Sequence, residues 1–332
     1  MLYEMTDAHF AAGTLDDVMR LAVEAIEARG GQIFPTKNKT TGALELIGVL
    51  LEIADPRARL SQTETRGKIF SALGELCWYL ARRNDLAFIE YYLKDYKDSA
   101  DGDEIYGGYG PRLFKWKEKN NLNQVANVTE MLRNKPDSRQ TVIQLFDAND
   151  IVEIHKDVPC TCTLQFMLRR GELHLLTYMR SNDVYRGLPH DVFCFTMLQE
   201  IIARTVEAEV GTYKHAVGSL HLYADDHQIV RRFVDEGWQP TLGIAMPRMP
   251  LGNPWPEIER LLEAESEIRT TGKFDRNALE TVDPYWADLI RLLLVFRFKT
   301  DRDWDSILAL RGDIVAKVYL PFIDTLLRKL SS

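Results

Sequence analysis

The chain has 332 residues, enough to bury a large core in one or two domains. Its formal net charge of −8 argues against general nucleic-acid binding, which favours basic surfaces, although a few arginines can still form a local anion site. No segment approaches the ~20 apolar residues of a membrane span, and the four cysteines do not form a disulfide-rich pattern. The N-terminal residues include early acids and no long apolar run, so we expect no secretory signal and a reducing, cytoplasmic setting.

The first part of the chain alternates helical and extended patterns. Apolar residues recur at helical spacing over 15–29, and Gly30 ends that predicted helix. A near-continuous apolar run over 42–53 predicts a strand that is buried on both faces. Residues 65–81 carry one apolar stripe and predict a helix, in which Glu75 lies close to the stripe. A buried carboxylate is costly without partners, so Glu75 is either functional or an ordinary surface residue.

A hairpin is predicted in the middle of the chain. Residues 160–166 read as a strand, Arg170-Gly171 as a turn, and a second strand runs on toward residue 183. Pairing of the two strands would bring Cys160, at the start of the first, beside Arg180, near the end of the second. The sequence therefore predicts a thiol next to a guanidinium.

Further elements surround the hairpin. Helices are predicted over 122–135, 192–208, 257–266, 284–298 and 305–330, and strands over 141–146 and 213–223. Together they predict an α+β fold with a large mixed β-sheet and flanking helices. Residues 1–250 would form the catalytic domain, and residues 251–332 would form a helical C-terminal extension packed on it.

Four motifs occur in a specific order. Pro-Cys is followed by Gln-Phe over 159–166, and Arg-Ser-x-Asp-Val-x-x-Gly-Leu-Pro spans 180–189. Gly-Ser-Leu-His-Leu-Tyr spans 218–223, and Gly-Glu-Leu-Cys-Trp-Tyr-Leu spans 74–80. This set resembles the thymidylate synthase superfamily over residues 35–245, which implies a thymidylate synthase-like fold. Its members pair their sheets into homodimers.

The resemblance implies a chemistry for the hairpin. Cys160 would add to C6 of a pyrimidine nucleotide, so that C5 can attack the one-carbon unit of 5,10-methylenetetrahydrofolate. Such a thiol needs a lowered pKa beside a fixed cation, and Arg180 would supply that cation. Glu75 would relay protons through water. Tyr109, in a glycine-rich segment, would also lie in the active site, although these glycines could serve only as turns.

The resemblance also implies contacts to both substrates. Arg180 and Ser181 would bind the nucleotide phosphate together with Arg139, which the partner subunit would donate across the dimer interface. Read without the resemblance, Arg139 is a surface cation at a strand end. His221 and Tyr223 resemble the pair that bonds the 3′ oxygen of the sugar, although they could simply be strand residues. The residues implied in folate binding are Asp183 and Gly187.

The chain departs from the family pattern at three places. Asn38 stands where a phosphate-binding arginine is expected, and Lys37 or Lys39 could replace it, or the loop could simply be solvated. Gln140 replaces the second of two arginines that family members donate across the dimer. Thr161 stands where thymidylate synthases usually have a histidine. These departures weaken the case for standard thymidylate synthesis.

Base identity depends on Asp191. Thymidylate synthases have an asparagine two residues after Leu-Pro, whose amide matches N3–H and O4 of uracil, whereas this chain has Asp191. A carboxyl group can accept from the 4-amino group of cytosine and, when protonated, donate to N3. This exchange marks the deoxycytidylate and cytidylate hydroxymethylases of the superfamily. The alternative is that Asp191 only caps a helix that starts at Val192.

The last residues, 327–332, do not resemble the apolar tail that closes over the folate in thymidylate synthases, which would make access of water easier. We therefore predict a hydroxymethyltransferase that acts on CMP or dCMP. The alternatives are a thymidylate synthase-type dUMP or dCMP methylase and a non-catalytic nucleotide-binding regulator. Cys160 and Cys162, with only His155 nearby, make an incomplete ligand set, so no metal is predicted.

Overall fold

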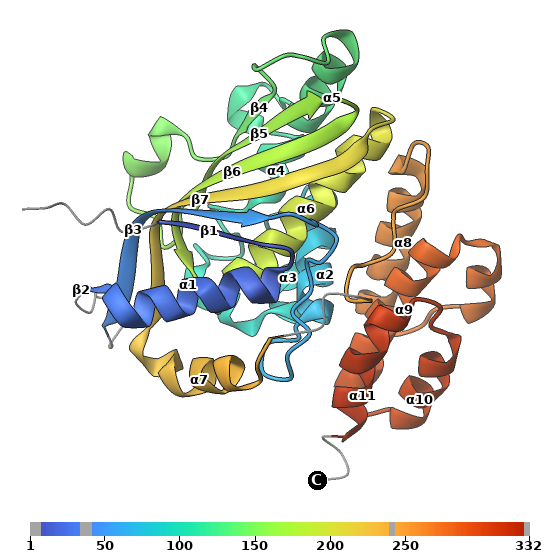
Figure 1. The fold of residues 1–332 in the computed structure, drawn as a ribbon. Helices are drawn as coiled ribbons and strands as arrows, with labels where there is room; N and C mark the ends of the chain where they lie inside the picture. The colour runs from blue at the N-terminus through green and yellow to red at the C-terminus, as the bar shows by residue number, and fades with distance from the viewer. Residues whose placement is uncertain (1–7, 34–41, 239–242, 329–332) are drawn as a thin grey trace, which may run out of the picture.

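The computed structural model describes residues 8–33, 42–238 and 243–328. Seven strands of these residues form one sheet in the order β1-β3-β7-β6-β5-β4, and β2 pairs with β3 (Figure 1). β1 runs parallel to β3 and β6 parallel to β7, whereas the other neighbours are antiparallel. The strands are β1 His9–Ala12, β2 Gly31–Ile33, β3 Ala43–Ile53, β4 Val142–Gln144, β5 Thr161–Arg169, β6 Glu172–Asp183 and β7 Glu209–Tyr223. The predicted α+β fold with a large mixed sheet is confirmed.

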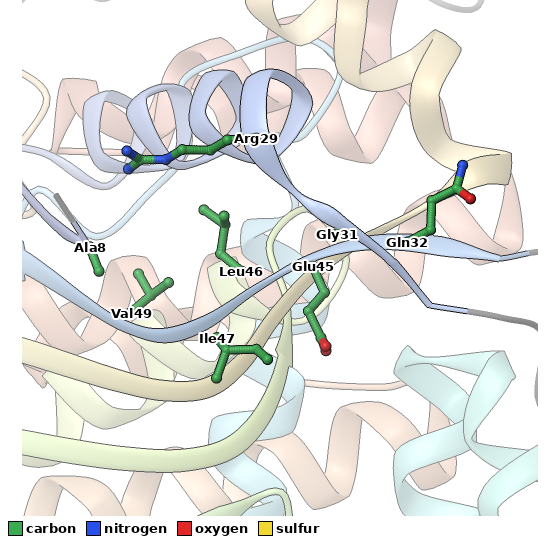
Figure 2. Close-up of a pocket in the computed structure, with 8 residues that line it drawn as sticks. All are labelled: Ala8, Arg29, Gly31, Gln32, Glu45, Leu46, Ile47 and Val49. Atoms are coloured by element: carbon green, nitrogen blue, oxygen red, sulfur yellow. The ribbon is translucent and has the colours of Figure 1, made fainter. Parts of the chain in front are cut away.

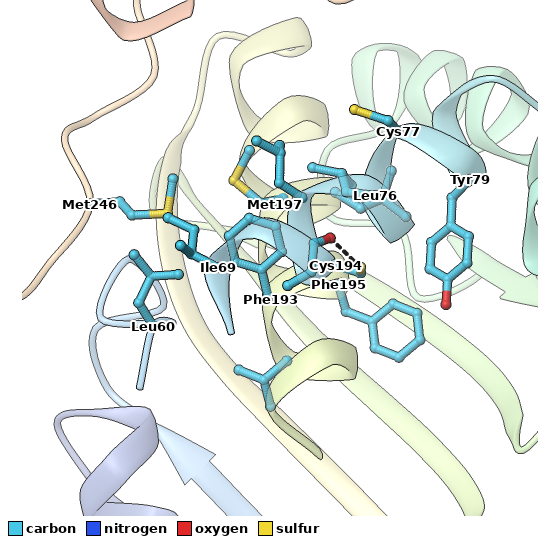
Figure 3. Packing of buried hydrophobic residues seen from close by; sticks show 14 of the residues in the cluster. Leu60, Ile69, Leu76, Cys77, Tyr79, Phe193, Cys194, Phe195, Met197 and Met246 are labelled. Carbon is cyan, nitrogen blue, oxygen red and sulfur yellow. Dashed lines mark hydrogen bonds between the residues drawn. The ribbon is translucent and has the colours of Figure 1, made fainter. Parts of the chain in front are cut away.

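Helices pack on the sheet and on one another. They are α1 Leu15–Arg29, α2 Ile69–Leu80, α3 Leu86–Tyr92, α4 Tyr109–Phe114, α5 Gln124–Asn134, α6 Leu188–Thr205, α7 His227–Asp235, α8 Trp255–Thr271, α9 Pro284–Asp301, α10 Trp304–Asp313 and α11 Leu320–Arg328. α6 contacts β6 and β7, and α2 packs on α6. Figure 3 shows part of this core, in which Ile69 and Leu76 of α2 and Phe193 and Met197 of α6 belong to one buried cluster.

One face of the sheet is buried and the other is largely open. On β6, Leu175 and Met179 are buried, whereas Tyr178 and Arg180 are exposed. On β3, Ile47 is 79% exposed next to Gly48, which has a φ of 71° within the strand. The prediction that residues 42–53 are buried on both faces is therefore wrong. The apolar run includes residues that point to the open face.

The predicted hairpin is present. β5 and β6 pair antiparallel, and they are joined by Arg170 and Gly171 at φ of 53° and 80°. Two successive left-handed residues give the twist that a two-residue hairpin turn requires. α6, which follows the hairpin, begins at Leu188 rather than at residue 192, with Pro189 in its first turn. Proline is well suited to this position because the first helical N–H groups have no partner within the helix.

The C-terminal helices α8 to α11 lie together at one side of the molecule, next to α2 (Figure 1). The single helix predicted over 305–330 is wrong, because the chain forms α10 and α11 with a break between them. The carboxylate of Asp288 in α9 accepts the backbone N–H groups of Val315 at 3.1 Å and Ala316 at 2.8 Å. These bonds hold the break in place.

Gly74 in α2 allows a close contact with Tyr92 of α3. A Cβ atom at Gly74 would lie 2.2 Å from the Tyr92 ring, whose hydroxyl donates to Glu265 of α8 at 2.8 Å. Gly74→Ala is therefore expected to lower the free energy of unfolding by about 3 kcal/mol, because the buried ring has no room to move. Urea unfolding measures this change. Gly312→Ala is the matched control, since no atom lies within 4 Å of the added Cβ there, and equal effects of both variants would contradict the prediction.

Candidate active site

Cys160 immediately precedes β5 and lies beside Arg180 on the neighbouring strand β6, as predicted. The backbone N–H of Arg180 donates to the Cys160 carbonyl at 2.8 Å. The Arg180 guanidinium donates to the carbonyl oxygens of Pro159 and Val158, each at 3.0 Å. These two bonds fix the cation along the segment that leads to the thiol. The hairpin therefore holds the Cys160 segment and the Arg180 guanidinium next to each other.

The thiol of Cys160 does not have the lowered pKa that we expected. Burial raises the pKa of Cys160 to about 12, and the nearby carboxyl groups of Asp157 and Asp191 raise it further, whereas the charge of Arg180 lowers it. Desolvation penalises the thiolate more than one guanidinium stabilises it. In the protein without substrate, Cys160 is thus a protonated thiol at neutral pH.

The alkylation rate of Cys160 provides a test of this balance. Because only the thiolate reacts, the rate with iodoacetamide should rise about tenfold per pH unit as the pH approaches the pKa. Arg180→Ala should slow the reaction at every pH below that pKa, since removing the cation raises the pKa of the thiol further. Arg180→Lys keeps a positive charge and is the control. Peptide mass spectrometry distinguishes Cys160 from the other three cysteines, all free. A faster reaction in Arg180→Ala would contradict this account.

Tyr109 contacts Thr161, the residue that follows the predicted nucleophile Cys160. Its hydroxyl accepts the backbone N–H of Thr161 at 3.1 Å and meets the Thr161 hydroxyl at 3.0 Å. Burial raises the pKa of Tyr109 well above its usual range, and the charge of Cys160 acts in the same direction. Thr161, which replaces the family's usual histidine, therefore anchors a protonated tyrosine beside the thiol.

Glu75 lies inside the protein rather than on its surface. The residue is 4% exposed, and its Oε1 atom accepts hydroxyl hydrogen bonds from Tyr79 at 2.8 Å and Tyr96 at 2.5 Å. Burial raises the pKa of Glu75, whereas these two bonds lower it. The two tyrosines are partners that the sequence did not predict, although Tyr79 follows Glu75 by one helical turn.

Asp191 lies in the first turn of α6, not at its cap. The cap position belongs to Gly187, and the backbone N–H of Asp191 donates to its carbonyl at 3.1 Å. The alternative that Asp191 caps a helix starting at Val192 is therefore wrong. Burial raises the pKa of Asp191 well above its usual range, and the charge of Glu75 acts in the same direction, whereas a hydrogen bond from Asn182 lowers it. Burial thus shifts Asp191 toward its protonated form.

Asn182 forms a side-chain hydrogen bond with Asp191. It is buried, and its amide nitrogen lies 3.0 Å from Nε2 of His215. Burial lowers the pKa of His215 to about 3, so this ring is neutral at pH 7. A Cβ atom on Gly187 would lie 2.9 Å from Asn182 Oδ1 and 3.6 Å from Asp191 Oδ2, which explains why a glycine stands here. Asn182 stands at the unspecified position of the Arg-Ser-x-Asp motif, so the motif could not identify it as a functional residue.

Asp183 has one satisfied and one unsatisfied carboxylate oxygen. Its Oδ1 accepts the backbone N–H groups of Tyr185 at 2.7 Å and Arg186 at 2.5 Å. Its Oδ2 is buried, with no hydrogen-bond partner among the described residues. Burial raises the pKa of Asp183. A buried acceptor without a partner is costly, so this oxygen is suited to an N–H donor on a ligand.

The predicted sugar and phosphate residues lie along β6 and β7. Asp183 pairs with His221 and Ser181 with Ser219 in the parallel register. His221 is 7% exposed, and its ring packs against Tyr223 with the centroids 4.9 Å apart. Ser181, His221 and Tyr223 thus lie on the two strands beside Cys160.

Arg139 is separated from this cluster within one chain. It is exposed and precedes β4, and its carbonyl accepts the side-chain N–H of Gln165 on β5 at 3.0 Å. The loop that contains Lys37, Asn38 and Lys39 lies outside the described residues. The structure therefore brings Arg180 and Ser181 to the site, and it leaves the other phosphate contacts as predictions.

A surface pocket of about 420 Å³ lies away from these residues, between the end of α1 and strands β2 and β3 (Figure 2). None of the predicted site residues lines it. The part of the chain that the structure describes contains no group of three or more His, Cys, Asp or Glu residues that could hold a metal ion. None of its helices is long and apolar enough to cross a membrane.

Comparison with known proteins identifies the family. The thymidylate synthase family model matches residues 35–252. The deoxyuridylate hydroxymethyltransferase of Bacillus phage SP01 is 33% identical over 195 residues, which cover 55% of this chain and 51% of that protein. The chain thus spans about half the length of this curated relative. Because the family model matches most of the chain, including the hairpin with Cys160 and the start of α6, the predicted resemblance is confirmed, and the chain belongs to the thymidylate synthase family.

Proposed function

We propose that the protein is a one-carbon transferase that adds a hydroxymethyl group to C5 of CMP or dCMP. It would use 5,10-methylenetetrahydrofolate and water, and release the 5-hydroxymethyl nucleotide and tetrahydrofolate. Membership of the family supports one-carbon transfer to C5 of a pyrimidine. The name of the phage relative, a hydroxymethyltransferase, supports the hydroxymethyl product. That relative is named for deoxyuridylate, so the choice of cytosine rests on this chain's own residues.

The observation that carries the choice of base is the state of Asp191. Its pKa is raised by burial and by Glu75, which favours the protonated carboxyl group. A protonated carboxyl group donates one hydrogen bond and accepts another, which matches N3 and the 4-amino group of cytosine. Uracil presents a donor at N3 and an acceptor at O4, so it would fit only if the hydroxyl and carbonyl oxygens of Asp191 exchanged places. The neighbouring Asn182 would orient the carboxyl group.

In the proposed reaction, the Cys160 sulfur bonds to C6 after losing its proton, and the electron pair moves through C5 toward the ring substituent at C4. C5 then bonds to the one-carbon unit of the folate and loses its proton, and the remaining bond from that carbon to the folate nitrogen breaks, so that tetrahydrofolate leaves and an exocyclic C=CH2 group remains at C5. Water adds to the exocyclic carbon, and the C6–sulfur bond breaks to restore the ring and the Cys160 thiolate. Glu75 would pass protons through water, and Tyr109 would support the segment that carries the nucleophile through its contact with Thr161.

The described residues fit a folate at this site. The co-substrate supplies the one-carbon unit, and the unpaired Oδ2 of Asp183 is an acceptor for the N–H groups of a pterin ring. A side chain at Gly187 would press on Asn182 and Asp191, the residues proposed to read the base. We propose no role for a metal ion.

We also propose that the protein is a homodimer formed through the open face of the sheet. Tyr178 on that face is 44% exposed, and Ile47 is 79% exposed, as expected of apolar residues that a second copy would cover. Arg139 of one subunit would then reach the phosphate held by Arg180 and Ser181 of the other. Residues 1–250 would form the catalytic domain, residues 251–332 an extension packed on it, and the protein would act in the cytoplasm.

Release of tritium from C5 tests the proposal. The purified protein is given methylenetetrahydrofolate and each of four nucleotides, CMP, dCMP, UMP and dUMP, labelled with tritium at C5. Folate-dependent release from a cytosine nucleotide alone is the expected result. Release from dUMP alone would contradict the assignment of Asp191. Nucleotide binding without release from any of the four would favour the non-catalytic regulator.

A further inference from the structure

Two tyrosine hydroxyl groups converge on one oxygen of Glu75. Tyr79 lies one helical turn after Glu75 in α2, and Tyr96 comes from the turn of 3-10 helix at Lys94–Ser99, after α3. Both donate to Oε1, at 2.8 Å and 2.5 Å. Among the described residues, the second oxygen, Oε2, has no hydrogen-bond partner, and it is not among the fully enclosed polar atoms. Oε1 of the carboxylate is thus held by two hydrogen bonds, whereas Oε2 remains available to accept a hydrogen bond from a ligand or a water molecule.

Packing fixes both tyrosines. The ring of Tyr79 lies 5.3 Å from that of Tyr109, and the ring of Tyr96 lies edge-on against Trp78 at 5.7 Å. Burial raises the pKa of both tyrosines well above the usual range, so both hydroxyl groups remain donors across the pH range in which proteins function. Rigid donors of this kind lose little freedom when they bind a carboxylate.

We propose, on the basis of the function proposed above, that Tyr79 and Tyr96 are positioning residues that hold Glu75 by Oε1, so that Oε2 takes the proton of the water that forms the hydroxymethyl group. The oxygen of this water bonds to the exocyclic carbon at C5, and its proton passes to Oε2. The electron pair of the exocyclic double bond moves into the ring and returns as the C6–sulfur bond breaks. The thiolate of Cys160 leaves, and Glu75 later returns its proton to solvent.

The charges around Glu75 fit this role. The charge of Arg66 favours the carboxylate form of Glu75, as do the two tyrosine bonds, whereas burial opposes it. Asp191 and Cys194 are its other titratable neighbours, and the charge of Glu75 raises the pKa of each. Of these groups, only Tyr79 and Tyr96 donate a hydrogen bond to Glu75. Their removal should therefore raise the pKa of Glu75, because two bonds that favour the charged form are lost.

The test uses Tyr79→Phe and Tyr96→Phe, with Tyr92→Phe as the matched control. Tyr92 also donates to a buried glutamate, Glu265, but it lies outside the site. The acidic limb of the pH profile of kcat should move up by about one pH unit in each of the first two variants, with kcat below the limb falling about tenfold. Tyr92→Phe should leave the limb in place. A loss of kcat that is equal at all pH values, with the limb unmoved, would overturn the proposal.

A second readout does not depend on turnover. The carboxyl stretching band of Glu75 is followed by infrared spectroscopy as a function of pH, as the difference between each protein and its Glu75→Gln counterpart. The midpoint should rise in Tyr79→Phe and Tyr96→Phe and stay unchanged in Tyr92→Phe; unchanged midpoints in all three would overturn the proposal. If the unaltered protein converts no nucleotide, the proposed function fails, while the infrared midpoints still decide whether the tyrosines hold the carboxylate.

Discussion

Replacing Cys160 by serine should reduce product formation by about 10³-fold or more, because the proposed reaction depends on a sulfur nucleophile that adds to C6. A serine hydroxyl in the same place has a far higher pKa than the thiol and is a much weaker nucleophile at neutral pH. The effect is measured as folate-dependent release of tritium from C5 of the preferred nucleotide. Binding of that nucleotide should change little, since Arg180 and Ser181 remain.

Cys162→Ser is the matched control. Cys162 is also half-buried, and its sulfur lies 4.0 Å from the Cys160 carbonyl, but it stands within β5. Its replacement should leave turnover close to that of the unaltered protein. Equal losses in both variants would mean that neither thiol is the nucleophile. Full activity of Cys160→Ser would contradict the covalent mechanism outright.

Asp191→Asn should exchange the preferred base. An amide presents a fixed donor and a fixed acceptor, which match N3–H and O4 of uracil, and it leaves a mismatched donor against the 4-amino group of cytosine. One buried mismatch costs about 1–3 kcal/mol, so kcat/KM for the cytosine nucleotide should fall by about 10²-fold. The kcat/KM for the uracil nucleotide with the same sugar should rise.

The ratio of the two kcat/KM values is the measurement, since a general loss of folding or of Cys160 reactivity cancels in it. Loss of activity on both bases with an unchanged ratio would show that Asp191 does not read the base. A role of Asp191 as a helix cap could not then explain the aspartate at this position, because α6 begins at Leu188.

The hairpin and its motifs could be predicted from sequence because local signals determine them. Arg170 and Gly171 supply the turn, strand alternation supplies the register, and these together bring Cys160 to Arg180. The family motifs then gave roles to residues that periodicity alone would not distinguish. The buried position of Glu75 also followed from its place beside an apolar helical stripe.

Properties that depend on distant parts of the chain could not be predicted. The pKa of Cys160 is set by desolvation from all sides, which outweighs the adjacent guanidinium that the sequence made visible. Tyr96 reaches Glu75 from a different element, 21 residues away in the chain. The exposure of Ile47 depends on which face of β3 lacks a covering helix. A continuous run of apolar residues does not indicate which face that is.

The most direct test of the central claim is the mass of the product. Purified protein is incubated with methylenetetrahydrofolate and an equimolar mixture of CMP, dCMP, UMP and dUMP, and the nucleotides are analysed by mass spectrometry. The account predicts a gain of CH2O on a cytosine nucleotide alone, and the nucleotide that gains it identifies the sugar. A gain of CH2, or conversion of a uracil nucleotide only, would contradict it.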